Sequence, residues 1–141
     1  MSESILVGQL SEIIRVGGRK RLTVRGRDIF IIARGSELFA LDSFCYHAGG
    51  PLHMGDIEEM PGYTCVVCPW HRYKITLRSG EGLYHSIDPH NLSKPPVLCS
   101  KGVKQRTHLV TLEGDDVYVT LSTGDPAHTK LESDQYNSPA S

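Results

Sequence analysis

Long hydrophobic runs and an excess of charge of one sign are both missing from this sequence. No apolar stretch approaches the ~20 residues that a membrane-spanning helix needs, so we expect no membrane attachment. Residues 1–8 lack a basic region and a long apolar stretch and are not Arg-rich, unlike signal or mitochondrial transit peptides. Lysine and arginine number 15 against 16 acidic residues, which argues against nucleic-acid binding. These absences predict a cytoplasmic protein.

Long amphipathic helices are absent too, and what remains is typical of a β protein. The 141 residues fit one domain that can bury a core without disulfides. Short apolar runs separated by turn signals predict strands at 29–33, 38–41, 63–67 and 73–77 and a hairpin at 108–121. We expect an all-β domain over 1–122, a sandwich or small barrel, in which 84–103 is a long irregular loop. The polar segment 123–141 is predicted to be a disordered tail.

Two short Cys/His pairs carry the chemistry of the sequence. Cys45 and His47 form a C-x-H pair, and Cys68 and His71 form a C-x-x-H pair about twenty residues later. Together they supply two thiolates and two imidazoles, enough to hold a binuclear iron–sulfur cluster with both sulfurs on one iron and both nitrogens on the other. We interpret the remaining cysteines and histidines as apolar fillers and solvated side chains, respectively: Cys65 and Cys99, and His53, His85, His90, His108 and His128.

Two other metal or redox sites are compatible with part of this pattern. Cys65 and Cys68 match C-x-x-C, but a redox dithiol needs a helix starting at the second cysteine, and Pro69 follows instead. The same cysteines with Cys45 and His47 could form a structural zinc module, although the C-x-H spacing is short for zinc and leaves His71 unexplained. Colour separates these readings, because zinc proteins are colourless and the iron cluster is reddish-brown.

The residues around the two pairs resemble the Rieske family. The matching text runs from Cys45 through Gly49, Gly50, Pro51 and Leu52, then Gly55, then Cys68-Pro69-Trp70-His71. The resemblance covers roughly residues 5 to 121 and is closest to the small soluble Rieske ferredoxins. It implies stacked antiparallel sheets with one [2Fe-2S] cluster held by two loops at one tip. The ligands it implies are Cys45, His47, Cys68 and His71.

The resemblance also implies a function and partners. A Rieske ferredoxin carries one electron from a reductase, often flavin-dependent, to a terminal oxidoreductase, and is not itself an enzyme. The alternative is a Rieske redox subunit or sensor module of a larger oxidoreductase complex. A monomer is expected. High-potential relatives carry a disulfide at the positions of Gly50 and Trp70 and a serine at Tyr73, so we expect a potential near the bottom of the roughly −150 to +300 mV range.

A basic stretch near the N-terminus allows two interpretations. Six cations lie within thirteen residues without an acid among them: Arg15, Arg19, Lys20, Arg21, Arg25 and Arg27. They are either the solvated face of a strand pair or a docking patch for an acidic redox partner.

Overall fold

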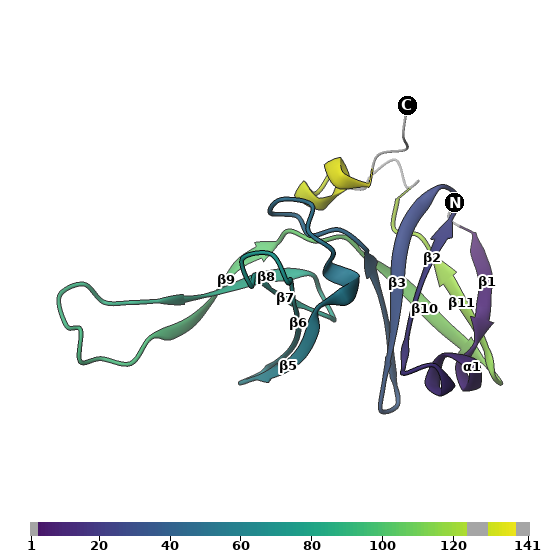
Figure 1. Cartoon of the computed structure of the whole chain (residues 1–141), viewed down its shortest axis with the longest axis horizontal. Coiled ribbons are helices and arrows are strands. Elements are labelled where there is room, and N and C mark those ends of the chain that lie inside the picture. Colours follow the sequence, from purple (N-terminus) through teal and green to yellow (C-terminus); the bar gives the residue numbers. More distant parts are fainter. Residues whose placement is uncertain (1–2, 124–129, 138–141) are drawn as a thin grey trace.

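A computed structural model describes residues 3–123 and 130–137 and contains two antiparallel sheets in its described part (Figure 1). The six-stranded sheet has the order β1-β11-β10-β4-β3-β2. Its strands, with the short helix α1 (Leu10–Arg15) after the first, are β1 (Ser4–Gln9), β2 (Arg19–Val24), β3 (Arg27–Arg34), β4 (Glu37–Asp42), β10 (Thr107–Glu113) and β11 (Asp116–Thr120). The Lys20 ammonium donates to the Val7 carbonyl at 2.8 Å, which links the edge strands β2 and β1 and nearly closes the sheet into a barrel.

The second sheet is five-stranded, with the strands in sequence order from β5 to β9. They are β5 (Asp56–Met60), β6 (Tyr63–Val67), β7 (Lys74–Thr76), β8 (Glu81–Ser86) and β9 (Val97–Val103). β8 and β9 extend from the body as an arm (Figure 1). The expectation of an irregular loop over 84–103 is therefore wrong at both ends, because Tyr84 pairs with Cys99 and Ser86 pairs with Val97.

Strand β3 separates two apolar cores. Phe30 and Ile32 point into a core shared with Cys45, Cys68 and the five-stranded sheet. The alternate residues Ile29 and Ile31 point into a second core with α1 and β11. Burial on both faces explains the continuous apolar run at 29–33, because successive side chains of a strand point to opposite faces. The all-β class is confirmed, and no helix among the described residues is long and apolar enough to cross a bilayer.

The C-terminal segment differs from its expectation over residues 130–137. It forms a short 3-10 helix, η2 (Glu132–Tyr136), with Ser133 and Asn137 buried. Asp134 bonds to Arg27 and Arg106, and the Asn137 side chain donates to the Asp28 carbonyl at 2.6 Å. Buried polar contacts rather than apolar burial therefore hold this segment, which is why its polar composition was misleading. Residues 124–129 and 138–141 of the expected tail lie outside the described part.

Candidate metal centre

The two Cys/His pairs lie in two loops that connect different strands. The first loop follows β4 and returns through the 3-10 helix η1 (Leu52–Met54), and the second joins β6 to β7. The first closes on itself, because the Cys45 amide donates to the Gly50 carbonyl and the Gly49 amide donates to the Cys45 carbonyl, both at 2.8 Å. In the second, the Cys68 amide donates to the Tyr73 carbonyl at 2.8 Å. His71 has a φ of 63°, a left-handed conformation that turns the chain tightly within this loop.

The four side chains come together as a pair of thiols and a pair of imidazoles. Cys45 and Cys68 are each 1% exposed and lie in the same apolar core, and the nearby Cys68 thiol adds to the rise in the pKa of Cys45. The rings of His47 and His71 meet edge to face with centroids 5.2 Å apart, and both histidines are exposed. The sulfurs therefore lie on the inner side of the site and the imidazoles at its rim.

This donor set fits a binuclear iron–sulfur cluster. Two thiols on one side and two imidazoles on the other match two ligands for each of two irons. Burial raises the pKa of the Cys45 thiol, and a hydrogen bond from the His47 backbone amide lowers it by less. A thiol buried this deeply becomes a thiolate when a metal ion takes the place of its proton. In the described part of the chain no group of three or more His, Cys, Asp or Glu side chains converges as a single metal ion would require.

Cys65 lies apart from this donor set. It is fully buried on β6 and is not in the core that contains Cys45 and Cys68, whereas its neighbour Val66 is. Strand alternation thus directs Cys65 and Val66 to opposite faces. No helix begins at Cys68, so the context that a C-x-x-C redox dithiol needs is missing from the described residues.

Aromatic rings support the exposed imidazoles. Tyr73 stacks on His47 with centroids 3.8 Å apart and an interplanar angle of 13°. Tyr46 meets Tyr73 edge to face, with ring centroids 5.8 Å apart. The Lys101 ammonium lies 4.6 Å from the Tyr73 ring centroid. Tyr73 therefore fixes the orientation of the His47 ring, a role that the sequence did not indicate.

Two glycines of the first loop allow close contacts, one with the second loop and one with η2. A Cβ atom on Gly50 would lie 2.8 Å from the Cys68 sulfur and 2.9 Å from Cγ of Trp70. Gly49 has a φ of +75°, and its Cβ would lie 2.7 Å from the ring of Tyr136 in η2. Both positions therefore favour glycine, which has no Cβ atom. Positions 50 and 70, where the high-potential relatives have their disulfide, are neighbours.

Gln105 supports the first loop through its side chain, a role that we did not predict from the sequence. Its side chain is 0% exposed and accepts a hydrogen bond from the Tyr46 amide at 2.9 Å. Its Nε2 donates to the carbonyls of Asp42 at 3.1 Å and Phe44 at 2.8 Å. All hydrogen bonds of this side chain therefore go to the backbone on either side of Cys45. A single glutamine between two strands carries no pattern that would reveal this.

The remaining histidines and the basic stretch are largely accounted for by local contacts. His108 is buried and hydrogen-bonds to Asp42 at 2.8 Å, so the interpretation of this residue as solvated is wrong. His128 lies outside the described residues. Each cation of the basic stretch has a partner. Arg15, Arg21, Arg25 and Arg27 pair with carboxylates, whereas Arg19 and Lys20 bond to backbone carbonyls. This stretch is therefore not a surface of free charge.

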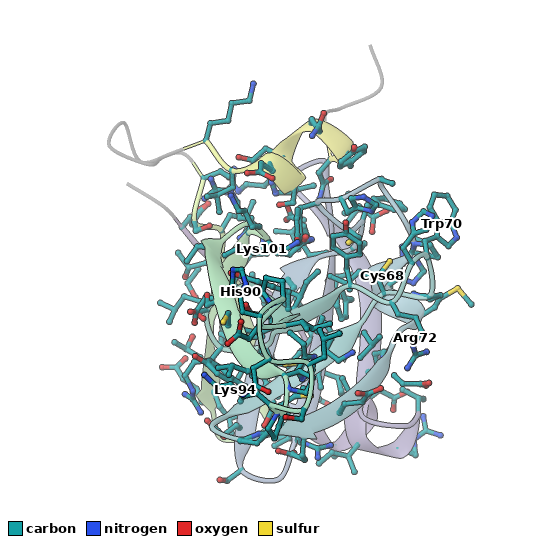
Figure 2. All side chains as sticks on the ribbon, turned by 90° about the vertical axis from the view of Figure 1, so that its left-hand side faces the viewer. Cys68, Trp70, Arg72, His90, Lys94 and Lys101 are labelled. Atoms are coloured by element: carbon teal, nitrogen blue, oxygen red, sulfur yellow. The ribbon has the colours of Figure 1, made fainter. Side chains whose placement is uncertain are left out.

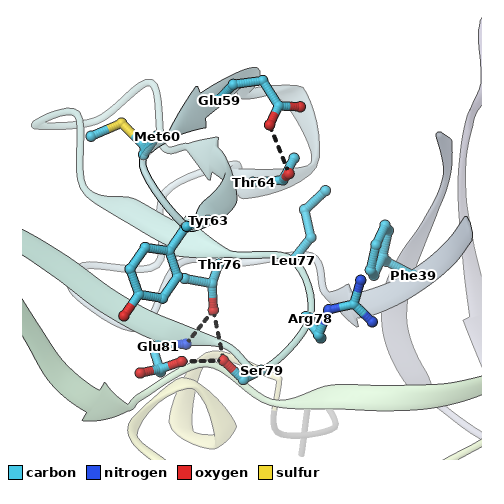
Figure 3. A pocket seen from close by; sticks show the side chains of 11 residues that line it. Phe39, Glu59, Met60, Tyr63, Thr64, Thr76, Leu77, Arg78, Ser79 and Glu81 are labelled. Carbon is cyan, nitrogen blue, oxygen red and sulfur yellow. Dashed lines mark hydrogen bonds between the residues drawn. The ribbon is translucent and has the colours of Figure 1, made fainter. Parts of the chain in front are cut away.

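A pocket of about 400 Å³ lies away from the four donors, between β6, β7 and the β7–β8 turn (Figure 3). Five of its polar side chains bond to one another: the Thr76 and Ser79 hydroxyls are 2.9 Å apart, Ser79 donates to Glu81 at 2.5 Å, and Thr64 donates to Glu59 at 3.0 Å. Tyr63 and Arg78 also line this pocket.

The fold and the donor set define a class of small iron–sulfur proteins, and sequence comparison agrees. The family described as soluble Rieske-type ferredoxin matches residues 5–124, and the chain belongs to this family. Its relatives include the Rieske domain-containing protein of Homo sapiens, which is 50% identical over 119 residues, covering 84% of this chain and 75% of that protein.

Two further proteins extend the comparison. The ferredoxin component of biphenyl 2,3-dioxygenase from Rhodococcus jostii (strain RHA1) is 33% identical over 96 residues, 68% of this chain and 73% of that protein. The ferredoxin of carbazole 1,9a-dioxygenase from Nocardioides aromaticivorans IC177 superposes with a TM-score of 0.62 at 20% identity, covering 86% of this chain and all of that one. This likeness shows a shared fold, and membership in the family implies an iron–sulfur cluster.

Proposed function

We propose that this protein is a one-electron carrier that holds one [2Fe-2S] cluster, with Cys45 and Cys68 on one iron and His47 and His71 on the other. The observation that carries the proposal is the separation of donors, with both thiols buried in one core and the imidazole rings 5.2 Å apart at the rim. When bound, the cluster accepts and releases a single electron. The chain keeps the sulfurs away from water and presents the imidazoles to a partner.

The carrier takes its electron from a flavin-dependent reductase and delivers it to a terminal oxidoreductase, without a substrate site of its own. Support comes from the family and from relatives named as ferredoxin components of dioxygenases. A permanent redox subunit of a larger complex is the alternative, and co-purification at fixed stoichiometry in high salt would favour it. None of the four cysteines is in a disulfide, which supports a reducing compartment such as the cytoplasm.

The potential of this centre lies near the bottom of the Rieske range. Gly50 and Trp70 cannot form the disulfide of the high-potential relatives, and the Tyr73 ring is engaged in stacking on His47. Fewer polar groups directed at the cluster sulfurs lower the potential. A midpoint above about +150 mV would contradict this reasoning.

The ligand assignment is tested by iron and sulfide analysis of anaerobically purified protein, with visible and paramagnetic resonance spectra. Cys45→Ser and Cys68→Ser should lose the iron, whereas the matched control Cys99→Ser, half-buried on β9, should keep it. His71→Ala should likewise lose the Rieske spectrum, and the exposed His85→Ala should not. Wild-type protein without iron, or a Cys68→Ser variant with an unchanged spectrum, would overturn the assignment.

A further inference from the structure

A groove of about 310 Å³ borders the candidate metal centre, between the second ligand loop and the base of the arm. It begins at His71, a proposed ligand, and runs across β7, β8 and β9. The residues that line it include three cations, two histidines and two tyrosines but no carboxylate: His71, Arg72, Tyr73, Lys74, Leu83, Tyr84, His85 and Lys101. The groove is thus a basic, aromatic surface in a chain whose net charge is −1.

The cations of this groove differ from those elsewhere in the protein. Among the cationic side chains that the structure describes, four have neither a carboxylate nor a carbonyl partner: Lys74, Lys94, Lys101 and Lys130. Two of these four, Lys74 and Lys101, line the groove. Arg72 pairs with Glu58 at 3.1 Å but keeps its side chain 66% exposed. The cations of the basic N-terminal stretch are neutralised or hydrogen-bonded within the chain. Lys74 and Lys101 are not, so their charge is available to a partner molecule.

Lys101 connects this charge to the metal centre. Its ammonium lies over the Tyr73 ring at 4.6 Å and 5.9 Å from the Tyr84 ring. Tyr73 in turn stacks on His47. The positive charge is thus one aromatic ring away from a proposed ligand, so a molecule attracted to Lys101 arrives beside the imidazole rim.

Exposed aromatic side chains flank the groove. Trp70 is 50% exposed and Tyr84 is 44% exposed. Figure 2 looks onto this side of the molecule and shows Trp70 and Arg72 at the ligand loop, with His90 and Lys94 on the arm. Tryptophan, tyrosine and arginine are the residues that most often anchor protein interfaces.

We propose that this groove docks the acidic face of the protein that exchanges electrons with the candidate centre, with Lys74 and Lys101 as the charges that attract it. The inference rests on the proposed electron-carrier function. Charge complementarity sets the kind of partner, because unpaired cations beside the exposed imidazoles favour carboxylates and guide encounters to the redox edge. A docking patch was one of two interpretations of the basic N-terminal stretch, and we assign that role to this groove instead.

The test uses small redox probes of opposite charge. Ferricyanide takes one electron from the chemically reduced protein and becomes ferrocyanide, and tris(phenanthroline)cobalt(III) accepts one electron as a cation. The variant K74E/K101E is compared with R15E/R25E, which makes the same charge change at exposed sites far from the groove. Iron content, spectrum and midpoint are measured first in each protein, so that a failure of the proposed function is seen separately from a failure of the docking surface.

At about 10 mM ionic strength, ferricyanide should oxidise K74E/K101E roughly tenfold more slowly than wild type, and the cobalt complex should react faster. The difference should vanish at high salt, and R15E/R25E should match wild type within about twofold. The exposed single variant K101E keeps the test available if K74E disturbs strand β7.

A second readout needs no electron transfer. On an immobilised poly-L-glutamate column, wild type should elute at higher salt than K74E/K101E, and R15E/R25E should elute with wild type. Intact clusters with equal ferricyanide rates in both double variants would overturn the docking surface and leave the carrier function standing. Binding of wild type to phosphatidylserine vesicles but not to polyglutamate would also overturn it, by assigning the groove to a lipid surface.

Discussion

Gln105→Leu tests whether a buried glutamine supports the first ligand loop. The substitution keeps a similar size and removes three hydrogen bonds, from the Tyr46 amide and to the carbonyls of Asp42 and Phe44. Each such bond contributes about 0.5–1.5 kcal/mol, and a buried backbone group left without a partner costs about 1–3 kcal/mol. Because the added apolar side chain offsets part of this loss, we expect a destabilisation of about 2–5 kcal/mol.

The assay is urea unfolding under anaerobic, reducing conditions, followed by far-ultraviolet circular dichroism and by visible absorbance of the cluster. The variant midpoint should fall by about 1–2 M, and cluster absorbance should disappear before secondary structure does. Gln135→Leu is the matched control, because this exposed side chain makes a single bond to the Glu132 carbonyl at 3.1 Å. A Gln105→Leu protein within about 0.5 kcal/mol of wild type would refute the role assigned to Gln105.

Three other perturbations separate the parts of the structure. Gly50→Ala brings a methyl group within 2.8 Å of the Cys68 sulfur and should reduce iron retained per chain. Burial alone would raise the pKa of Asp134, but hydrogen bonds from Arg106, the Leu131 amide and Arg27 outweigh burial and lower this pKa. The stability of the wild type should therefore fall as the pH drops below about 4. Asp134→Asn should be less stable than wild type at pH 7 and should not lose further stability from this group in acid. Phe30→Ala, in the core beneath the ligand loops, should speed extraction of iron by a chelator more than Ile31→Ala in the other core.

Controls and contrary outcomes are simple to define for these variants. Ala48→Ser lies in the same loop as Gly50 but is exposed, so it should retain full iron content. Equal iron content in Gly50→Ala and wild type would show that the loops can separate without losing the site. Equal acid sensitivity of wild type and Asp134→Asn in thermal melts would show that this carboxylate does not anchor the C-terminal segment. Equal chelation rates for Phe30→Ala and Ile31→Ala would mean that the two cores act as one.

The sequence predicted the features that depend on residues close together in the chain. It missed the polar contacts between residues that are far apart in the chain. The two Cys/His pairs and the hairpin at 108–121 were visible because their partners lie within a few residues of each other. Three prolines between Tyr84 and Val103 suggested an irregular segment, although they lie at the end of the arm and its strands flank them. Gln105 and Asp134 gave no signal, since each acts alone across a long sequence separation and its polar character is typical of a surface.

The position of η2 has a consequence for biosynthesis. Tyr136 covers Gly49 and its hydroxyl donates to the His47 carbonyl at 3.3 Å, so the last described turn lies against the first metal-binding loop. A ribosome adding about 5–20 residues per second needs roughly 3–13 s to proceed from His71 to Tyr136. During that interval both Cys/His pairs have been synthesised, whereas the turn that covers the first of them has not. We therefore expect the first loop to be more open to cofactor delivery before Tyr136 is added than in the finished chain.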